Sequence, residues 1–263
     1  MNTKLLNEKA LSVIDQYIHF GIGQNVINIP YYNNKRIGLH GGLPVQVGKG
    51  SPKDIYDEIQ NISILEKINV KNLDSVTLKK YLVDHNIGID CSGLAYYILN
   101  AECIGRGKST LDKYISFTDS GGIFGRIKAK MMPEKNISVS VLANDKNSKI
   151  VSLKEILPGD IITMIGEVNK NTRDPQRNHV LIIHQVEYQN FIPTTLHYTH
   201  AISWPTDGEY DHGVRQGTIE IIDAEKILIE QKWIEKEKIN GENYTFMRAI
   251  KNTIEIRRIK PLF

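Results

Sequence analysis

Apolar residues recur at helical spacing in the first third of the chain. From 8 to 20 they fall every three or four positions, as expected for one buried helix face, at Ala10, Leu11, Val13, Ile14, Tyr17 and Ile18. A second helix is expected over about 51–61, because Ser51 is a capping residue type and Pro52 fits a first helical turn. A third is expected over about 75–85.

A fourth predicted helix begins within the segment Gly88-Ile89-Asp90-Cys91-Ser92-Gly93. Asp90 is a residue type that caps helices, and residues 94–99 form an apolar run compatible with a buried helix. Cys91 is thereby placed in the first turn, among unpaired backbone N–H groups at the positive end of the helix dipole. Both features favour the thiolate over the thiol, which suits a nucleophile. The alternative interpretation is a small buried apolar residue, the commonest role of a free cysteine.

The pattern changes to strands in the second half of the chain. Short runs rich in β-branched residues alternate with turns, which is typical of an antiparallel sheet; they span about 161–165, 179–188, 194–203, 217–223 and 254–259. Helices first and strands later indicate an α+β fold. Between the two halves, residues 103–150 show weak periodicity and are expected to form an irregular insertion with one or two short helices.

Composition narrows the classes of function. A chain of 263 residues that is 41% hydrophobic can bury a substantial core. The net charge of +3 is spread without a basic stripe, so no nucleic-acid partner is expected. The first residues lack the apolar core of a signal peptide, and no run is long enough to span a membrane. We therefore expect a cytoplasmic protein with no membrane partner, although export by another route stays open.

The chain has two cysteines, Cys91 and Cys103, so no disulfide framework is expected. A metal site is not expected either, because neither an HExxH nor a CxxC motif is present. No cofactor is predicted.

A catalytic cysteine needs a base, and five of the eight histidines lie in the strand region: His179, His184, His197, His200 and His212. Side chains alternate along a strand, so His179 and His184, five positions apart, point to opposite faces. The same holds for His197 and His200, three positions apart. At most one of each pair can serve one site. Any single strand histidine is more often a packed or surface residue than a catalyst.

Four segments, in this order, resemble the NlpC/P60 family of papain-like cysteine hydrolases. They are Asp90-Cys91-Ser92-Gly93-Leu94, Leu157-Pro158-Gly159-Asp160-Ile161-Ile162, His179-Val180-Leu181-Ile182-Ile183 and Tyr198-Thr199-His200-Ala201. In that family a helix start carries the nucleophile, a PGD turn leads into the first core strand, and two later strands carry the base and a third residue. The resemblance covers about residues 88–203.

The resemblance implies a papain-like fold: an antiparallel sheet of about five or six strands packed against helices, with the nucleophile at a helix N-terminus. It implies an N-terminal helical and loop region, 1–80, packed on a catalytic domain, 81–263, that contains the insertion. By the same resemblance Cys91 is the nucleophile, His179 the general base and His200 the residue that orients His179.

The resemblance also indicates residues for oxyanion or substrate binding. The backbone N–H groups of Cys91 and Ser92 are expected near the developing oxyanion, next to the cap Asp90. The family often has a tyrosine ahead of a glycine pair, and Tyr31 or Tyr32 ahead of Gly41-Gly42 is the candidate here.

The implied activity is that of a cysteine peptidase or amidase, which cleaves an amide of a cell-wall peptide or related peptide through a thioester. Two alternatives stay open: an acyltransferase that uses the same thioester, and a non-catalytic binding protein on the same fold. If His200 points away from the site, His197, or an Asn or Glu, is the third residue instead. The sequence does not predict an oligomeric state.

Overall fold

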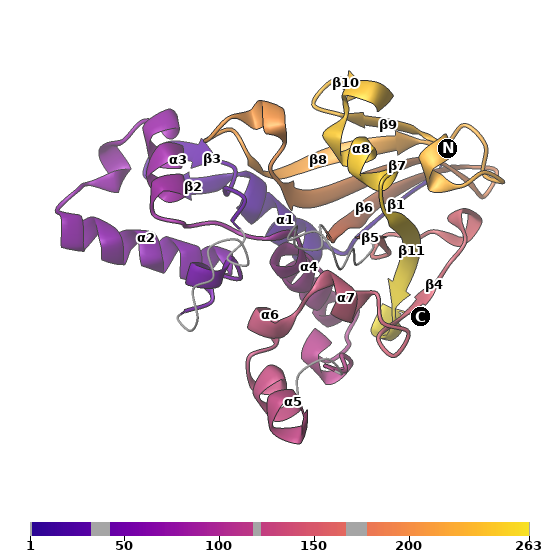
Figure 1. The fold of residues 1–263 in the computed structure, drawn as a ribbon, viewed down its shortest axis with the longest axis horizontal. Coiled ribbons are helices and arrows are strands. Elements are labelled where there is room, and N and C mark those ends of the chain that lie inside the picture. Colours follow the sequence, from indigo (N-terminus) through magenta and orange to yellow (C-terminus); the bar gives the residue numbers. More distant parts are fainter. Residues whose placement is uncertain (1, 33–42, 118–121, 167–177, 263) are drawn as a thin grey trace, which may run out of the picture.

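The computed structural model describes residues 2–32, 43–117, 122–166 and 178–262 (Figure 1). Its centre is an antiparallel sheet with nine strands among these residues, in the order β10-β9-β8-β7-β6-β5-β11-β4, with β1 paired to β6. The strands are β1 (Asn2–Leu5), β4 (Ser148–Ile150), β5 (Ile161–Ile165), β6 (His179–Gln189), β7 (Ile192–Ile202), β8 (Gly213–Glu220), β9 (Lys232–Glu235), β10 (Lys238–Ile239) and β11 (Thr253–Ile259). A separate hairpin joins β2 (Phe20–Ile22) to β3 (Asn25–Ile27).

The helices of the described residues are α1 (Glu8–Ile18), α2 (Pro52–Glu66), α3 (Ser75–Asp84), α4 (Cys91–Gly105), α5 (Gly122–Met131), α6 (Pro133–Asn136), α7 (Val139–Leu142) and α8 (Tyr244–Ala249). Figure 1 shows α2 and α3 beside the β2–β3 hairpin at one end of the molecule, and α5 to α7 below α4 in this view. None of these helices is both long and apolar enough to cross a bilayer.

The α+β class and the predicted helices are confirmed. Ser51 caps α2 through the N–H of Asp54, with Pro52 in the first turn, as the sequence predicts. The sheet, however, has nine strands among the described residues rather than five or six, and the insertion holds three short helices rather than one or two. The additional strands β1, β4, β9 and β10 have two to four residues each, too few for an alternating pattern to be recognised.

The sheet packs on both faces. On one face Val180, Ile182 and Ala201 join a large apolar cluster with α1 and α4. On the other face Leu181, Ile183 and Tyr198 pack with Trp233 and with side chains of α8, in a second cluster. The strands in the middle of the sheet therefore contribute alternate residues to two cores, which explains the continuous apolar runs of β5 and of residues 180–183 in β6.

Strands β6 and β7 separate at one end of the sheet. Their pairing runs to Ile182↔Thr199 and stops there. Beyond this point β7 continues beside β8 as far as Ile202↔Gly213. The first residues of β6 stay with β5, as far as Met164↔His179. The sheet is thus split between β6 and β7 at the end where His179 and His200 lie.

The turn before β5 is fixed by a buried ion pair. Both carboxylate oxygens of Asp160 accept from Arg258 of β11, at 2.7 and 2.8 Å, and Asp160 also accepts from the N–H of Leu157. Asp160 is 1% exposed. Arg258 therefore joins β11 to the PGD turn and helps to set where β5 and β6 begin.

Replacing this arginine will destabilise the fold. Arg258→Met leaves the Asp160 carboxylate buried without its partner, and we expect the free energy of unfolding to fall by about 3 kcal/mol in urea titrations. The control is Lys154→Met, which removes an exposed ion pair with Glu225 and should change stability by less than about 0.5 kcal/mol. Equal effects of the two variants would contradict the role assigned to Arg258.

Candidate active site

Cys91 is the first residue of α4, as predicted. The side chain of Asp90 caps the helix by accepting from the N–H of Gly93 at 2.6 Å, and Leu94 donates to the Asp90 carbonyl. The thiol is 5% exposed. The N–H groups of Cys91 and Ser92 belong to the first turn, where helix geometry provides no carbonyl partner.

A buried lysine binds the polar side chains on both sides of Cys91. The Lys49 ammonium lies 2.8 Å from Asp90 Oδ1, 2.6 Å from Ser92 Oγ and 3.0 Å from the carbonyl of Ile137. The side chains of Asp90 and Ser92 therefore face Lys49. The role of this turn in binding an oxyanion or a substrate stays a prediction, and it concerns the backbone N–H groups rather than these two side chains.

The Cys91 thiol lies in the split between β6 and β7. The N–H of Ile183 points toward the β5 side, to the carbonyl of Asp160. Because N–H groups alternate along a strand, the N–H of Val180 points to the other side, where β7 has already separated. This N–H is near enough to the thiol to lower the pKa of Cys91. Cys91 thus lies near the N–H of Val180, which has no β7 residue paired with it. Val180 directly follows His179 in the chain.

His179 and His200 meet across the same split. Nε2 of His179 lies 2.8 Å from Nδ1 of His200, and both rings are fully buried. Strand alternation places His179 on the face of Leu181, and His200 stacks edge-on against Tyr198 of that face. Nδ1 of His179 is buried and has no hydrogen-bond partner among the described residues. The split therefore has the Cys91 thiol beside the N–H of Val180 and the imidazole pair on the strand residues next to it.

Glu235 of β9 completes the buried series. Its Oε2 accepts from the hydroxyl of Tyr198 at 2.7 Å and lies 3.1 Å from Nε2 of His200. This second contact is close but does not have the geometry of a hydrogen bond. Arg215 is 3.8 Å from the other carboxylate oxygen. Burial acts to raise the pKa of Glu235, but His200, Tyr198 and Arg215 together hold it below its usual range.

This arrangement assigns the protons. An ionised Glu235 only accepts, so a single proton on the His200 ring belongs on Nε2, the nitrogen nearest the carboxylate. Nδ1 of His200 then accepts from Nε2 of His179. Nδ1 of His179 then carries a lone pair, so this nitrogen can accept the proton of a thiol.

Both reacting groups are neutral at rest. Burial raises the pKa of Cys91 to about 11 and Asp90 adds to the rise, whereas Lys49, Arg248 and the N–H of Val180 oppose it. Burial also lowers the pKa of His179 well below its usual range, and Arg248 and His200 act in the same direction. The expectation of a resting thiolate is wrong, because removing the thiol from water outweighs its place at a helix start.

The other strand histidines have contacts of their own, and the parity prediction is confirmed, since His179 meets His200 whereas His184 lies beside His197. His184 contacts the hydroxyl of Thr199, and its ring lies 6.1 Å from that of His197. His197 contacts Glu187 at 3.0 Å. His200, rather than His197, is therefore the histidine that meets His179. His212 accepts from the backbone N–H of Tyr31.

The two candidate tyrosines adjoin the cysteine segment. Tyr31 forms a β-bridge with Ile89, and Tyr32 donates its N–H to the Ile89 carbonyl. Tyr31 is half-buried, whereas the Tyr32 hydroxyl is buried and has no hydrogen-bond partner in the part of the chain that the structure describes. The pair Gly41-Gly42 lies outside the described residues. Both tyrosines therefore contact Ile89, which lies two positions before Cys91 in the chain. Their role in substrate binding stays a prediction.

Sequence reasoning missed Lys49, Glu235 and Arg248. Lys49 lies in a glycine-rich run and Glu235 in a four-residue strand, so neither carries a local pattern that marks it. Arg248 belongs to the short helix α8, and its charge acts on both Cys91 and His179. All three lie outside the motif segments, so the sequence alone does not connect them with the site.

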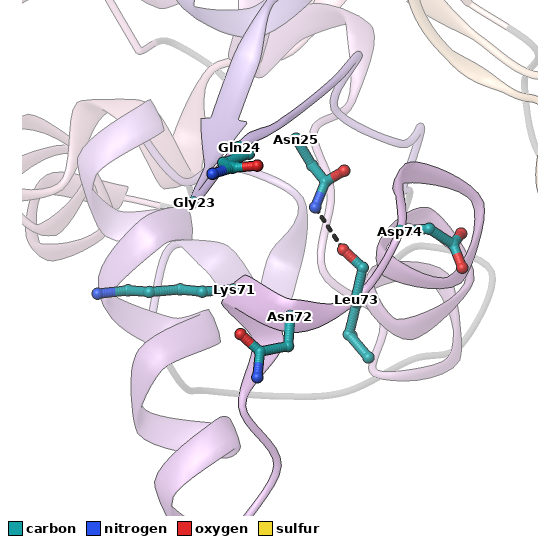
Figure 2. A pocket seen from close by; sticks show the side chains of 7 residues that line it. All are labelled: Gly23, Gln24, Asn25, Lys71, Asn72, Leu73 and Asp74. Carbon is teal, nitrogen blue, oxygen red and sulfur yellow. Dashed lines mark hydrogen bonds between the residues drawn. The ribbon is translucent and has the colours of Figure 1, made fainter.

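A polar hollow lies elsewhere, between the β2–β3 turn and the start of α3 (Figure 2). Asn25 donates to the carbonyl of Leu73 across it, and Lys71, Asn72 and Asp74 line the remainder. Its lining has neither a thiol nor an imidazole, so it offers no nucleophile and base pair. Among the described residues, no three His, Cys, Asp or Glu side chains are placed to hold a metal ion.

Comparison with known proteins gives no further guide: no family model, no curated protein and no solved structure matches this chain.

The neutral resting state predicts how Cys91 reacts with iodoacetamide. Because only the thiolate reacts, the rate should rise about tenfold per pH unit between about pH 7 and pH 10. Alkylation resolved by peptide mass spectrometry measures this, with Cys103 as the internal comparison. Burial also raises the pKa of Cys103 to about 11, and its side chain is 0% exposed, so it should react more slowly. A rate that is already constant from about pH 7 would show a resting thiolate instead.

Proposed function

We propose that this chain is a papain-like cysteine hydrolase that cleaves amide bonds with Cys91 as nucleophile and His179 as base. The observation that supports this most strongly is the buried, unpaired Nδ1 of His179 at the split where the Cys91 thiol lies. An unpaired buried nitrogen is costly to maintain in a core, and proton transfer gives it a use. A binding protein on the same fold has no such need for it.

In the proposed reaction His179 takes the thiol proton on Nδ1 as Sγ attacks the amide carbonyl carbon. The positive charge that forms on His179 lies next to His200, which is itself backed by the Glu235 carboxylate. The N–H groups of Cys91 and Ser92 are the proposed donors to the oxyanion. His179 then gives its proton to the leaving amine as the C–N bond breaks, and a thioester remains on Cys91.

The second half of the reaction consumes one water. His179 accepts a proton from the water as its oxygen attacks the thioester carbonyl. The C–S bond breaks, Cys91 recovers its proton and a carboxylic acid leaves. The net change is amide plus water to acid plus amine, which the site's own residues can catalyse. A peptide amide is the proposed substrate class, with cell-wall peptides as the first members to test.

Substitutions of Cys91, His179 and Glu235 should lower the rate of hydrolysis by less, the farther the residue lies from the reacting atoms. On a panel of wall-derived and ordinary peptides, Cys91→Ala should abolish amine release, and His179→Ala should lower the rate about 10³-fold. Glu235→Gln should lower it about tenfold, because the histidines lose their charged partner but keep their contact. Amine release by fluorescamine assay measures all three.

The matched control is His197→Ala, which removes a strand histidine that does not meet His179. It should leave the rate within about twofold of the unmodified chain. Turnover that survives in Cys91→Ala would rule out the proposed nucleophile. A loss in His197→Ala as large as in His179→Ala would rule out the proposed base.

A further inference from the structure

Lys49 connects the glycine-rich segment to the first turns of α4 by backbone as well as side chain. The Gly48 carbonyl accepts from the N–H of Asp90, and the Lys49 carbonyl accepts from the hydroxyl of Tyr97. Gly93 makes this approach possible, because a Cβ there would lie 3.0 Å from both the Gly48 oxygen and Lys49 Cδ. The lysine side chain lies across the start of the helix and is only 6% exposed.

The ammonium group also joins α4 to the insertion. It has three oxygen partners, the Asp90 carboxylate, the Ser92 hydroxyl and the Ile137 carbonyl, which match the three donors of an ammonium. A fully satisfied buried lysine holds its neighbours in one arrangement, since moving any of them leaves a buried charge unpaired. The start of α4 is thereby fixed relative to residues 48–50 and 137.

Two opposite charges therefore lie next to the nucleophile in a region shielded from water. Asp90 directly precedes Cys91, and its carboxylate disfavours a negative charge on the thiol, whereas Lys49 favours it. At the low effective dielectric of a buried site such charges act more strongly than in solvent. Without the lysine, the capping carboxylate would oppose every step in which Sγ becomes negative.

We propose that Lys49 is a positioning residue for Cys91: its ammonium holds the start of α4 in the split between β6 and β7 and cancels the charge of the Asp90 cap at the nucleophile. Its importance for catalysis rests on the proposed function, but its effect on the thiol does not. A lysine that only held the helix start would stabilise the fold without a directional effect on thiol reactivity.

The other charged or titratable groups of the candidate site come from different elements. The charged group that acts on the thiol besides Asp90 and Lys49 is Arg248 on α8, and the candidate base His179 on β6 is followed by His200 and Glu235. None of them contacts Lys49 through the bonds described above. A cycle built on Lys49 and Asp90 therefore leaves these groups in place.

The test is a double-variant cycle read out by iodoacetamide alkylation of Cys91 at several pH values. Lys49→Met should slow alkylation about three- to tenfold at a given pH, because the carboxylate is left uncancelled. Asp90→Asn should accelerate it by a similar factor, since an asparagine still caps the helix. The double variant should return close to the unmodified chain. Circular dichroism confirms that each variant is folded.

One control separates this effect from general damage. Lys79→Met removes another buried lysine, whose ammonium contacts Asn28, and should leave Cys91 alkylation unchanged. If Lys49→Met does not fold, Asp90→Asn still decides the matter, because Lys49 keeps its partners Ser92 and Ile137. Single variants that shift alkylation in the same direction, or an Asp90→Asn variant that reacts no faster, would overturn the proposal.

The alkylation cycle and the peptide assay together distinguish the proposed role of Lys49 from the proposed hydrolase function. Opposite shifts in the single variants with no peptide turnover would support the role of Lys49 and reject the hydrolase function. Turnover that needs Cys91, together with shifts of equal sign, would support the hydrolase and reject the role of Lys49.

Discussion

The separation of β6 from β7 is the constraint on which the candidate site depends. In a closed sheet the N–H of Val180 would bind β7, and the two faces would be isolated from each other. Because β7 follows β8 instead, the start of α4 can bring Cys91 into the opening. The histidines come to the same opening from the opposite face. The three candidate residues Cys91, His179 and His200 thus lie on a helix start and two strands rather than on loops, which gives the candidate site the rigidity that the proposed reaction needs.

Burial is the second consequence of this arrangement, and it sets the chemistry. The thiol and both imidazoles lie in the core, so charged forms are disfavoured until a partner compensates them. The chain supplies such partners in pairs: Glu235 with Arg215 behind the histidines, and Asp90 with Lys49 beside the cysteine. A site of this kind rests as a neutral thiol and a neutral imidazole. In the proposed reaction charge separates only when Sγ attacks.

The sequence predicted those parts of the site that depend on local pattern. The capping aspartate and the apolar run place Cys91 at a helix start, and strand parity separates His179 from His184 and His197 from His200. It could not predict the split, since the end of β6–β7 pairing depends on how β7 follows β8. It gave no sign of Glu235, which a four-residue strand brings in 35 positions after His200. The ionisation of Cys91 was predicted with the wrong sign, because the helix start is a local feature and burial is a tertiary one.

The most direct test of the account is acylation by p-nitrophenyl acetate, which needs no knowledge of the natural substrate. The ester tests the nucleophile, its base and the oxyanion donors together, and intact-mass and peptide mass spectrometry locate the acetyl group. We expect one acetyl group on Cys91, formed at a rate that falls about 10²-fold or more when His179 is replaced by alanine. Acetylation that favours Cys103 or surface lysines, or that proceeds equally fast without His179, would contradict it.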